Sequence, residues 1–325
     1  MGTVRLRAGP DDEGRRLDRV LRKACAELPI SAIHRLLRKG LVSVDGKRAG
    51  QACLVKSGQS IEIPDLDIAE AAVRGKNCRQ ERRQAGSVIS IGNGIEVLYE
   101  GQGILAICKP AGIATQEELG ALVLGYLEGK IEPSLSFTPG PLHRLDRSTS
   151  GVIVFGKSLS GARLFSELLR SGLLRKVYIA LLEGGLHDEQ LWRDRIGYSN
   201  SAQKAYVTAP RGGPREGPAA SCAETLVFPL ELQGNFTLAA IEIATGRRHQ
   251  IRAQAAARGF PLYGDRKYGG RERPPFFLHA CRLVFPETSP FPRSISAPPP
   301  PAFQQKLLQL GFSPAVLSAG VLPGI

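Results

Sequence analysis

The sequence predicts an α+β protein of two domains, and three observations support this prediction. The chain has 325 residues, which suits about two domains of ordinary size. Residues 1–65 and 91–310 each combine short apolar strands with helices. Between them, residues 66–90 carry crowded arginine and lysine with little apolar periodicity, which indicates a basic linker. Residues 311–325 form a C-terminal tail to which we assign no structure.

Two amphipathic helices are expected in residues 1–65. The apolar face of the first recurs at helical spacing and consists of Leu17, Val20, Leu21 and Ala24. Pro29 ends this helix, because proline cannot continue it. Ser31 is expected to cap the second helix and Gly40 to stop it. The inward residues of that second helix are Ile33, Leu36 and Leu37.

A small sheet completes this N-terminal region. Residues 41–44 alternate in the manner of a strand, and residues 59–63 form a second one. The dipeptide Asp45-Gly46 after the first strand is a strong hairpin signal. The sequence therefore predicts a compact α/β unit.

Basic side chains gather on the outer faces of the two expected helices. They are Arg15, Arg19, Arg22, Arg35, Arg38 and Lys39. One charged helix face is usually only solvated, but two consecutive basic helices favour contact with RNA phosphates. The net charge of +13 likewise points to a polyanionic partner. The linker at 66–90 is open to the same two interpretations, RNA contact or a solvated tether.

Composition indicates a cytoplasmic protein. The six cysteines are dispersed, with no pair spaced for a zinc knuckle or a redox site. Dispersed cysteines are typical of a reducing compartment. The N-terminal stretch 1–12 lacks the apolar core of a signal peptide, and no run approaches the length of a membrane span. We therefore expect no membrane partner.

The second domain is expected to begin near Ile91. Its predicted strands are 95–100, 104–108, 177–182 and 236–243. Its predicted helices are 160–169, one that opens at Thr245 and runs to Arg258, and 303–310. Residues 199–221 are polar and rich in Gly, Pro and Arg, which indicates a loop.

One stretch of this domain concentrates charge between a turn and a strand. Residues 142–151 read L-H-R-L-D-R-S-T-S-G and place Asp146 between Arg144 and Arg147. They follow a turn-prone Pro-Gly-Pro and run into an apolar strand at 152–155. Nearby cations favour the ionised form of a carboxyl group. On these residues alone, a salt-bridged surface loop is the simpler interpretation.

The wider pattern resembles the RluA family of pseudouridine synthases. The stretch matches the family signature H-R-L-D-x-x-T-S-G, with Ser148 in place of a common Asp. Five further segments stand in the family's order, one before this stretch and four after it: K-P-A-G at 109–112, K-x-Y-x-A at 176–180, T-G-R-x-H-Q-I-R at 245–252, G-D-x-x-Y-G at 264–269 and L-H-A at 278–280. Cys108 replaces the usual Asn before the first, and Arg248 replaces Thr within the third.

This resemblance implies a fold and a reaction. The expected catalytic fold is a mixed, largely antiparallel sheet flanked by helices, and the N-terminal region is similar to an S4-like RNA-binding domain. The reaction breaks the bond between ribose carbon 1′ and uracil nitrogen 1 and rejoins the base through its carbon 5. Because no atoms or electrons are gained, no cofactor is expected.

The resemblance also assigns roles to residues. Asp146 is the nucleophile, Arg252 pairs with it, and Tyr178 stacks on the base or relays its proton. Leu278 packs on the other side of the pocket, and Arg144 helps take the place of the flipped-out base. The histidine that precedes it, His143, is expected to contact the substrate.

Several alternatives remain open at this stage. The expected substrate is large-subunit ribosomal RNA, because the N-terminal region resembles that of such enzymes, with tRNA as the alternative. A non-catalytic RNA-binding or ribosome-assembly factor could use the same scaffold. A metal site is not expected, because the candidate ligands His143, Asp146, His249 and His279 lie in separate segments. No G-x-S-x-G elbow of a serine hydrolase is present. A monomer is expected.

Overall fold

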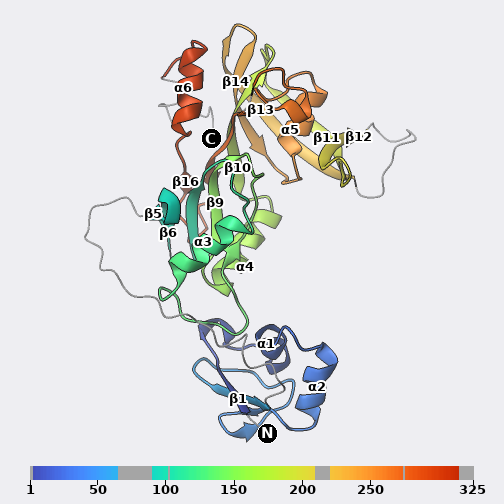
Figure 1. The fold of residues 1–325 in the computed structure, drawn as a ribbon, viewed down its shortest axis with the longest axis vertical. Helices are drawn as coiled ribbons and strands as arrows, with labels where there is room; N and C mark the ends of the chain where they lie inside the picture. Colours follow the sequence, from blue (N-terminus) through green and yellow to red (C-terminus); the bar gives the residue numbers. More distant parts are fainter. Residues whose placement is uncertain (1–2, 65–89, 102, 209–219, 274, 315–325) are drawn as a thin grey trace, which may run out of the picture.

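The computed structural model describes residues 3–64, 90–101, 103–208, 220–273 and 275–314. Within them the chain forms two sheets, a four-stranded one near the N-terminus and a twelve-stranded one (Figure 1). We call residues 3–64 the N-terminal unit and residues 90–314 the catalytic unit. The predicted linker at 66–90 lies outside the described residues except for Ser90, and the tail does so from residue 315.

The N-terminal unit packs two helices on its sheet, which has the strand order β1-β4-β2-β3. Its elements are β1 (Thr3–Arg7), η1 (Pro10–Asp12), α1 (Leu17–Ala24), α2 (Ile30–Arg38), β2 (Ser43–Val44), β3 (Lys47–Arg48) and β4 (Ser60–Pro64). Asp45 and Gly46 both have positive φ, at 49° and 77°, which confirms the predicted hairpin turn. Gly40 has φ 65° directly after the second helix and stops it as expected.

Three details of this unit differ from the expectation. Ser31 does not cap α2, because the helix already begins at Ile30 and Pro29 holds the cap position. The strand expected at 41–44 is confined to Ser43–Val44, since the chain first folds back on α2 through a bond from the Leu41 N–H to the Leu36 carbonyl. The first strand, β1, was not predicted, and it pairs antiparallel with β4.

The catalytic unit is built on one large sheet whose main strand order is β12-β11-β13-β14-β10-β15-β9-β7-β6-β5. These strands are β5 (Ser90–Ile91), β6 (Ile95–Glu100), β7 (Ile104–Lys109), β9 (Ser150–Gly156), β10 (Arg175–Glu183), β11 (Gln190–Ser199), β12 (Lys204–Thr208), β13 (Ser221–Gln233), β14 (Phe236–Ile243) and β15 (Leu278–Val284). The short strands β8 (Gly140–Pro141) and β16 (Ser294–Ser296) pair with β9 and β15. The helices are α3 (Glu118–Leu127), α4 (Leu159–Arg170), α5 (Gln250–Ala257) and α6 (Pro301–Gln309), with the 3-10 turns η2 (Gly92–Gly94) and η3 (Arg266–Tyr268).

This sheet confirms the predicted α+β class with a mixed, largely antiparallel sheet. Among the described strands, only β15 and β9 pair in parallel. They approach closely at Gly151, where an added Cβ would lie 2.2 Å from the Ala280 carbonyl oxygen. Gly151 also has φ 119°, which side chains rarely adopt. The glycine of the signature is therefore needed for backbone packing at this pair of strands.

The predicted strands at 95–100 and 236–243 are confirmed, and the other predicted helices and strands are found within a few residues. The loop expected at 199–221 is wrong in part, because Lys204–Thr208 pairs with β11 as strand β12. Helix α5 begins at Gln250 and not at Thr245, because residues 245–249 form the turn that leads into it. No helix of the described residues is long and apolar enough to cross a membrane.

The two units touch each other, although the N-terminal one was expected on a tether. Asp12 of η1 accepts a hydrogen bond of 2.9 Å from the backbone N–H of Leu135 in the catalytic unit. Leu135 also packs against the hydrophobic core of the N-terminal unit. The contact is therefore both polar and apolar.

Candidate active site

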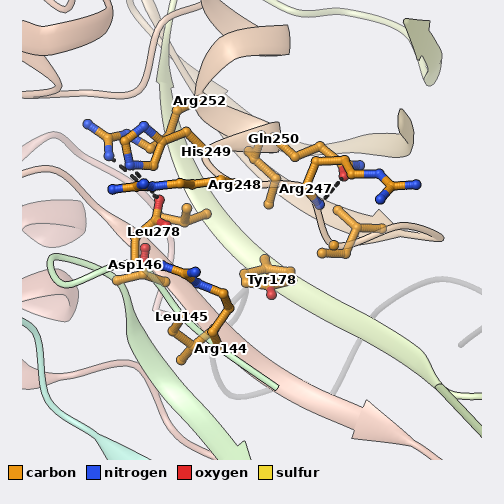
Figure 2. A pocket seen from close by; sticks show the side chains of 14 residues that line it. Arg144, Leu145, Asp146, Tyr178, Arg247, Arg248, His249, Gln250, Arg252 and Leu278 are labelled. Atoms are coloured by element: carbon orange, nitrogen blue, oxygen red, sulfur yellow. Dashed lines mark hydrogen bonds and ion pairs between the residues drawn. The ribbon is translucent and has the colours of Figure 1, made fainter. Parts of the chain in front are cut away.

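A cavity of about 480 Å³ opens where the loop before β9 meets the start of α5 (Figure 2). Its walls come from four separate parts of the chain: residues 144–149, β10, residues 243–252 and β15. The lining side chains with chemistry or shape to offer are Arg144, Asp146, Tyr178, His249, Arg252 and Leu278. Five of the six catalytic and substrate-binding residues predicted from the sequence are thus brought together here.

The loop that carries Asp146 is fixed from below by the buried Lys109. The Lys109 side chain is fully buried, and its Nζ donates to the carbonyl oxygens of Pro110, Ile113 and Arg147 at 2.9–3.0 Å. These three acceptors match the three protons of an ammonium group. Burial lowers the pKa of Lys109 to about 8, and the negative charge of Asp146 opposes that shift. The K-P-A-G segment therefore acts as a clamp on the Asp146 loop.

Arg252, the last residue of the T-G-R-x-H-Q-I-R segment, lies beside Asp146. Its Nη1 lies 3.6 Å from Oδ2 of Asp146 and is mostly buried. The closer partner is Asp265, which accepts from Nε at 2.7 Å and from Nη2 at 2.8 Å. This bidentate pair fixes the plane of the guanidinium, and the remaining nitrogen is left to face Asp146.

Aromatic rings hold the same guanidinium in place. The Arg252 guanidinium carbon lies 4.8 Å from the ring centre of Tyr268 and 4.7 Å from that of Phe276. Such contacts are favourable for a planar cation and are stronger where water is excluded. The guanidinium of Arg252 is therefore oriented by the carboxylate of Asp265 at its edge and by the two aromatic rings beside it.

His249 is the second side chain with a nitrogen beside Asp146. Its Nε2 lies 3.7 Å from Oδ2 of Asp146, and its Nδ1 lies 2.9 Å from the hydroxyl oxygen of Tyr268. That hydroxyl accepts from the Ala205 N–H at 2.7 Å, so its own proton is free to point at Nδ1. When the hydroxyl donates to Nδ1, the imidazole proton is on Nε2, the nitrogen that faces Asp146.

The backbone and the charge state of His249 are both unusual. Its φ is 53°, in the left-handed region, at the residue that caps α5. Non-glycine residues with such a conformation cluster at functional sites. Burial lowers the pKa of His249 to about 4, although Asp146 opposes the shift. The imidazole is therefore neutral at neutral pH and adds no positive charge beside Asp146.

Tyr178 and Leu278 form the apolar walls of the cavity. Tyr178 lies on β10, opposite Ile241 of β14, and Leu278 opens β15. Both side chains are largely buried. Burial raises the pKa of Tyr178 far above its usual value, and the charge of Asp146 raises it further. The phenol is therefore neutral, and its flat face is available to a base.

A wider groove of about 970 Å³ adjoins the cavity and shares Asp146 and Arg252 with it. Its lining carries four exposed basic side chains, Arg144, Arg147, Arg248 and Lys267. Within the described part of the chain the guanidinium of Arg144 makes no hydrogen bond or ion pair. The groove therefore offers positive charge at the mouth of the cavity, where a polyanion that enters it would lie.

His143 does not lie where the sequence expectation put it. It lines neither the cavity nor the groove. Its ring stacks on Phe165 at 5.7 Å, and its Nε2 accepts from the Val154 N–H at 3.1 Å. Burial lowers the pKa of His143 to about 3. A role in direct contact with the substrate is not supported by this position, because the ring packs under the loop.

The predicted basic residues of the N-terminal unit are at its surface. Arg19, Arg22, Arg35, Arg38 and Lys39 are exposed, whereas Arg15 is half-buried and lies just before α1. A groove is lined by Arg15, Arg19, Arg22, Lys23, Ala26, Leu28, Pro29 and Ile30. The basic residues of α2 do not line it, so the two helices do not share one basic groove.

Sequence reasoning quoted the motifs around His249, Asp265 and Tyr268 but assigned these residues no role. Their signal was present in the segments T-G-R-x-H-Q-I-R and G-D-x-x-Y-G, which the fold places side by side. Only the structure shows that they form one network around Arg252. Among the described residues, no group of three or more His, Cys, Asp or Glu is placed to hold a metal ion.

Comparison with known proteins agrees with this geometry. The family model described as RNA pseudouridylate synthase matches residues 103–257. The chain is 32% identical over 298 residues to the ribosomal large subunit pseudouridine synthase C of Salmonella typhi, covering 85% of this chain and 86% of that protein. It is 31% identical over 298 residues to the protein of that name from Escherichia coli K12, with the same coverage.

Two solved structures share the fold. One, human RNA pseudouridylate synthase domain containing 4, aligns with a TM-score of 0.55 at 21% identity and covers 66% of this chain and 92% of that chain. The other, human RNA pseudouridylate synthase domain containing 1, aligns with a TM-score of 0.50 at 22% identity and covers 71% of this chain and 99% of that chain.

Proposed function

The chain belongs to the RNA pseudouridylate synthase family, and from this premise we propose that it isomerises uridine in large-subunit ribosomal RNA, with Asp146 as the nucleophile. The substrate is proposed from two observations. The bacterial relatives that match most of the chain are named for the large ribosomal subunit. The N-terminal unit carries exposed basic side chains, and we propose that it is an S4-like RNA-binding domain.

The observation that carries the mechanism is the position of Asp146. Its carboxylate lies 3.6 Å from the Arg252 guanidinium in a cavity walled by Tyr178 and Leu278. A stacked uridine cannot reach such a cavity, so the nucleotide must flip out of its helix. Tyr178 and Leu278 would then hold the uracil, and Asp146 would face the bond between ribose and base.

The remaining groups support each step of the reaction. A carboxylate nucleophile needs a fixed direction of attack, which the pairing with Arg252 supplies. The uracil is loose once its bond to carbon 1′ breaks, and the walls of the cavity hold it in place while it turns. The neutral phenol of Tyr178 lies where it can stack on the base or relay the proton from carbon 5. Arg144, at the mouth of the cavity, would occupy the space that the flipped base leaves.

In this proposal the groove at the cavity mouth binds the RNA backbone. Arg147, Arg248 and Lys267 are exposed there and would contact phosphates on either side of the target uridine. Phosphate contacts position a nucleic acid without reading its sequence. Since the relatives are bacterial proteins of ribosomal RNA modification, the proposed location is the cytoplasm. The proposed assembly state is a monomer.

The direct test compares two matched substitutions. Asp146→Asn should abolish pseudouridine formation on a large-subunit ribosomal RNA transcript while RNA affinity and thermal unfolding stay near wild type. Asp188→Asn, at an exposed site in the same unit, should leave turnover unchanged. Pseudouridine is measured by chemical mapping of the RNA. Substantial turnover by purified Asp146→Asn would remove Asp146 from the proposed role. Modification of tRNA alone by the wild type would overturn the ribosomal substrate.

A further inference from the structure

The N-terminal unit meets the catalytic unit through two neighbouring carboxylates of η1. Asp12 is fully buried, which is rare for an unpaired carboxylate unless it accepts several hydrogen bonds. Its two oxygens accept from the hydroxyls of Ser134 and Ser136 and from the N–H of Leu135, all in the catalytic unit. Within the described part of its own unit, the carboxylate of Asp12 accepts a hydrogen bond only from the Gly9 N–H, at 2.8 Å.

The loop on the catalytic side is shaped to meet Asp12. The Ser134 oxygen accepts from the N–H groups of Ser136 and Phe137, which closes a tight turn. Its hydroxyl proton is then directed at Asp12 at 3.1 Å. The same turn is anchored in the catalytic unit, since Phe137 lies close to Gly156 of β9.

A second carboxylate binds at a different element. Asp11 accepts from the Leu159 N–H at 2.9 Å, and Leu159 is the first residue of α4. The first N–H groups of a helix have no partner inside the helix, and a negative charge there is favourable. Arg15 adds a third contact by donating to the Ser136 carbonyl at 3.3 Å. Three residues of the N-terminal unit thus make polar contacts with two parts of the catalytic unit, which fixes an orientation that one contact could not.

The contact is also tight at backbone level. A Cβ added to Gly9 would lie 2.0 Å from the carbonyl oxygen of Pro133. Gly9 has φ −94° and ψ −178°, an extended conformation that any residue adopts. The glycine is therefore required by the approach of the two units and not by the local backbone.

The position of this contact sets a distance to the active site. Segment 140–142 runs back along β9, with Gly140 opposite Gly156 and the Leu142 N–H bonded to the Val154 carbonyl. The Asp12 contact thus lies beyond the end of β9, and Asp146 lies before its start. The strand between them has seven residues and is about 20 Å long. In Figure 1 the N-terminal unit accordingly lies at the bottom and α5 at the opposite end of the catalytic unit.

We propose that the N-terminal unit is a fixed arm, docked through Asp11 and Asp12, whose α1 groove holds RNA phosphates at a set distance from Asp146. The groove begins at the contact itself, because Arg15 both lines it and donates to Ser136. Its other basic side chains, Arg19, Arg22 and Lys23, are exposed along the groove. The proposal rests on the proposed function, since it assigns the RNA backbone that flanks the target uridine to this groove.

A fixed arm has a measurable consequence for substrate length. RNA that reaches both the arm and the cavity binds at two points, and the effective concentration for the second contact is higher when the arm is fixed at the right distance than when only the linker holds it. A short stem-loop that fills the cavity alone gains nothing from the arm. Undocking should therefore weaken the reaction on long RNA and leave the reaction on short RNA unchanged.

The test uses the full chain with Gly9→Ala, and Gly50→Ala as the matched control. Gly50 lies in the same unit with nothing within 4 Å of an added Cβ. Amide hydrogen exchange, without RNA, is measured for Leu135 and Leu159, whose N–H groups bond to Asp12 and Asp11. Gly9→Ala should lose the protection of both amides, whereas Gly50→Ala should keep it. The kcat/KM on a large-subunit ribosomal RNA transcript should fall on the order of tenfold or more in Gly9→Ala only.

A second variant approaches the contact from the catalytic side. The double substitution Ser134→Ala, Ser136→Ala removes two donors to Asp12 without changing the N-terminal unit, and it should give the same pattern. Unchanged protection in Gly9→Ala would overturn the docking. Lost protection with unchanged kcat/KM on long RNA, or an equal fall on a short stem-loop, would overturn the role of the arm. Absence of pseudouridine with the wild type would instead overturn the proposed function. The exchange measurement would still test the docking, because it is made without RNA.

Discussion

Arg252 is bound to Asp265 more closely than to Asp146. Two nitrogen–oxygen distances of 2.7 and 2.8 Å join it to Asp265, whereas 3.6 Å separates its nearest nitrogen from Asp146. Asp265 is almost fully buried, while Asp146 is partly open to the cavity. Asp265 therefore holds the guanidinium in place, and Asp146 faces a cation whose position is already fixed.

Arg252→Lys should be far from conservative for this reason. Lysine keeps the charge, but it cannot make two parallel bonds to Asp265 while it also faces Asp146. It also loses the planar contacts with Tyr268 and Phe276. Misplacement of a group by about 1 Å can cost on the order of a hundredfold in rate. We expect such a loss in kcat with a modest change in RNA affinity, measured by single-turnover kinetics and filter binding.

Asp265→Asn provides a check on this explanation from the other partner. It should reproduce the loss in kcat although Asp265 is not among the residues that line the cavity. A buried guanidinium without its carboxylate should also lower the free energy of unfolding, by about 3 kcal/mol. Asp194→Asn, which breaks a partly buried pair with Arg258, is the matched control and should leave kcat unchanged. Normal turnover in Asp265→Asn would refute the role of Asp265 in positioning Arg252.

Tyr268→Phe tests the network that orients His249. The change removes the hydroxyl that bonds to the Nδ1 of His249 and to the Ala205 N–H, but it keeps the ring beside Arg252. We expect kcat to fall about tenfold, equivalent to about 1.4 kcal/mol, because the imidazole loses its fixed proton position. The KM for RNA should not change. The unpaired Ala205 N–H should cost about 1–3 kcal/mol of stability.

The control for this substitution is Tyr206→Phe. Tyr206 lies on β12, next to Ala205, and is 40% exposed. It should keep both the rate and the unfolding temperature of the wild type. If Tyr268→Phe loses stability but keeps full kcat, then Tyr268 has only a structural role and His249 is not oriented through it.

The sequence predicted the site better than it predicted the sheet. Asp146, Tyr178, Arg252 and Leu278 meet in one cavity because each stands in a motif with a distinctive local pattern. Strands β11 and β13 were missed, and both are long and only partly buried, so their apolar signal is diluted by polar residues. Helix α3 was missed as well, within a stretch between motifs for which no element was predicted.

The local sequence could not predict which residues distant in the chain contact each other. His143 precedes Arg144 in the signature, yet its ring turns to Phe165 because the loop doubles back along β9. Asp12 likewise lies in an ordinary acidic turn, and its partners are more than a hundred residues away. Long-range contacts of this kind depend on topology, which no single segment encodes.

Buried histidines should make stability depend on acid pH. Burial lowers the pKa of His143 to about 3, whereas an unfolded histidine titrates near 6.5. Between these values the unfolded chain binds one proton more than the folded chain, so stability rises with pH in this window and is lost as pH falls below about 6.5. Near pH 5 the slope from this residue is about 1.4 kcal/mol per pH unit. His249 and His279, with pKa values lowered to about 4, act in the same direction.

His143→Gln isolates the contribution of one of these histidines. Glutamine can still accept a hydrogen bond from the Val154 N–H, which His143 Nε2 accepts in the structure, but it cannot titrate. The free energy of unfolding, followed by the fluorescence of the single, buried Trp192, should therefore depend less steeply on pH between 4 and 6.5 in the variant, by about one proton. His187→Gln, at an exposed site, should retain the wild-type slope. Parallel curves for the wild type and His143→Gln would show that the buried imidazole is not held neutral, because a neutral histidine must take up a proton when the chain unfolds in acid.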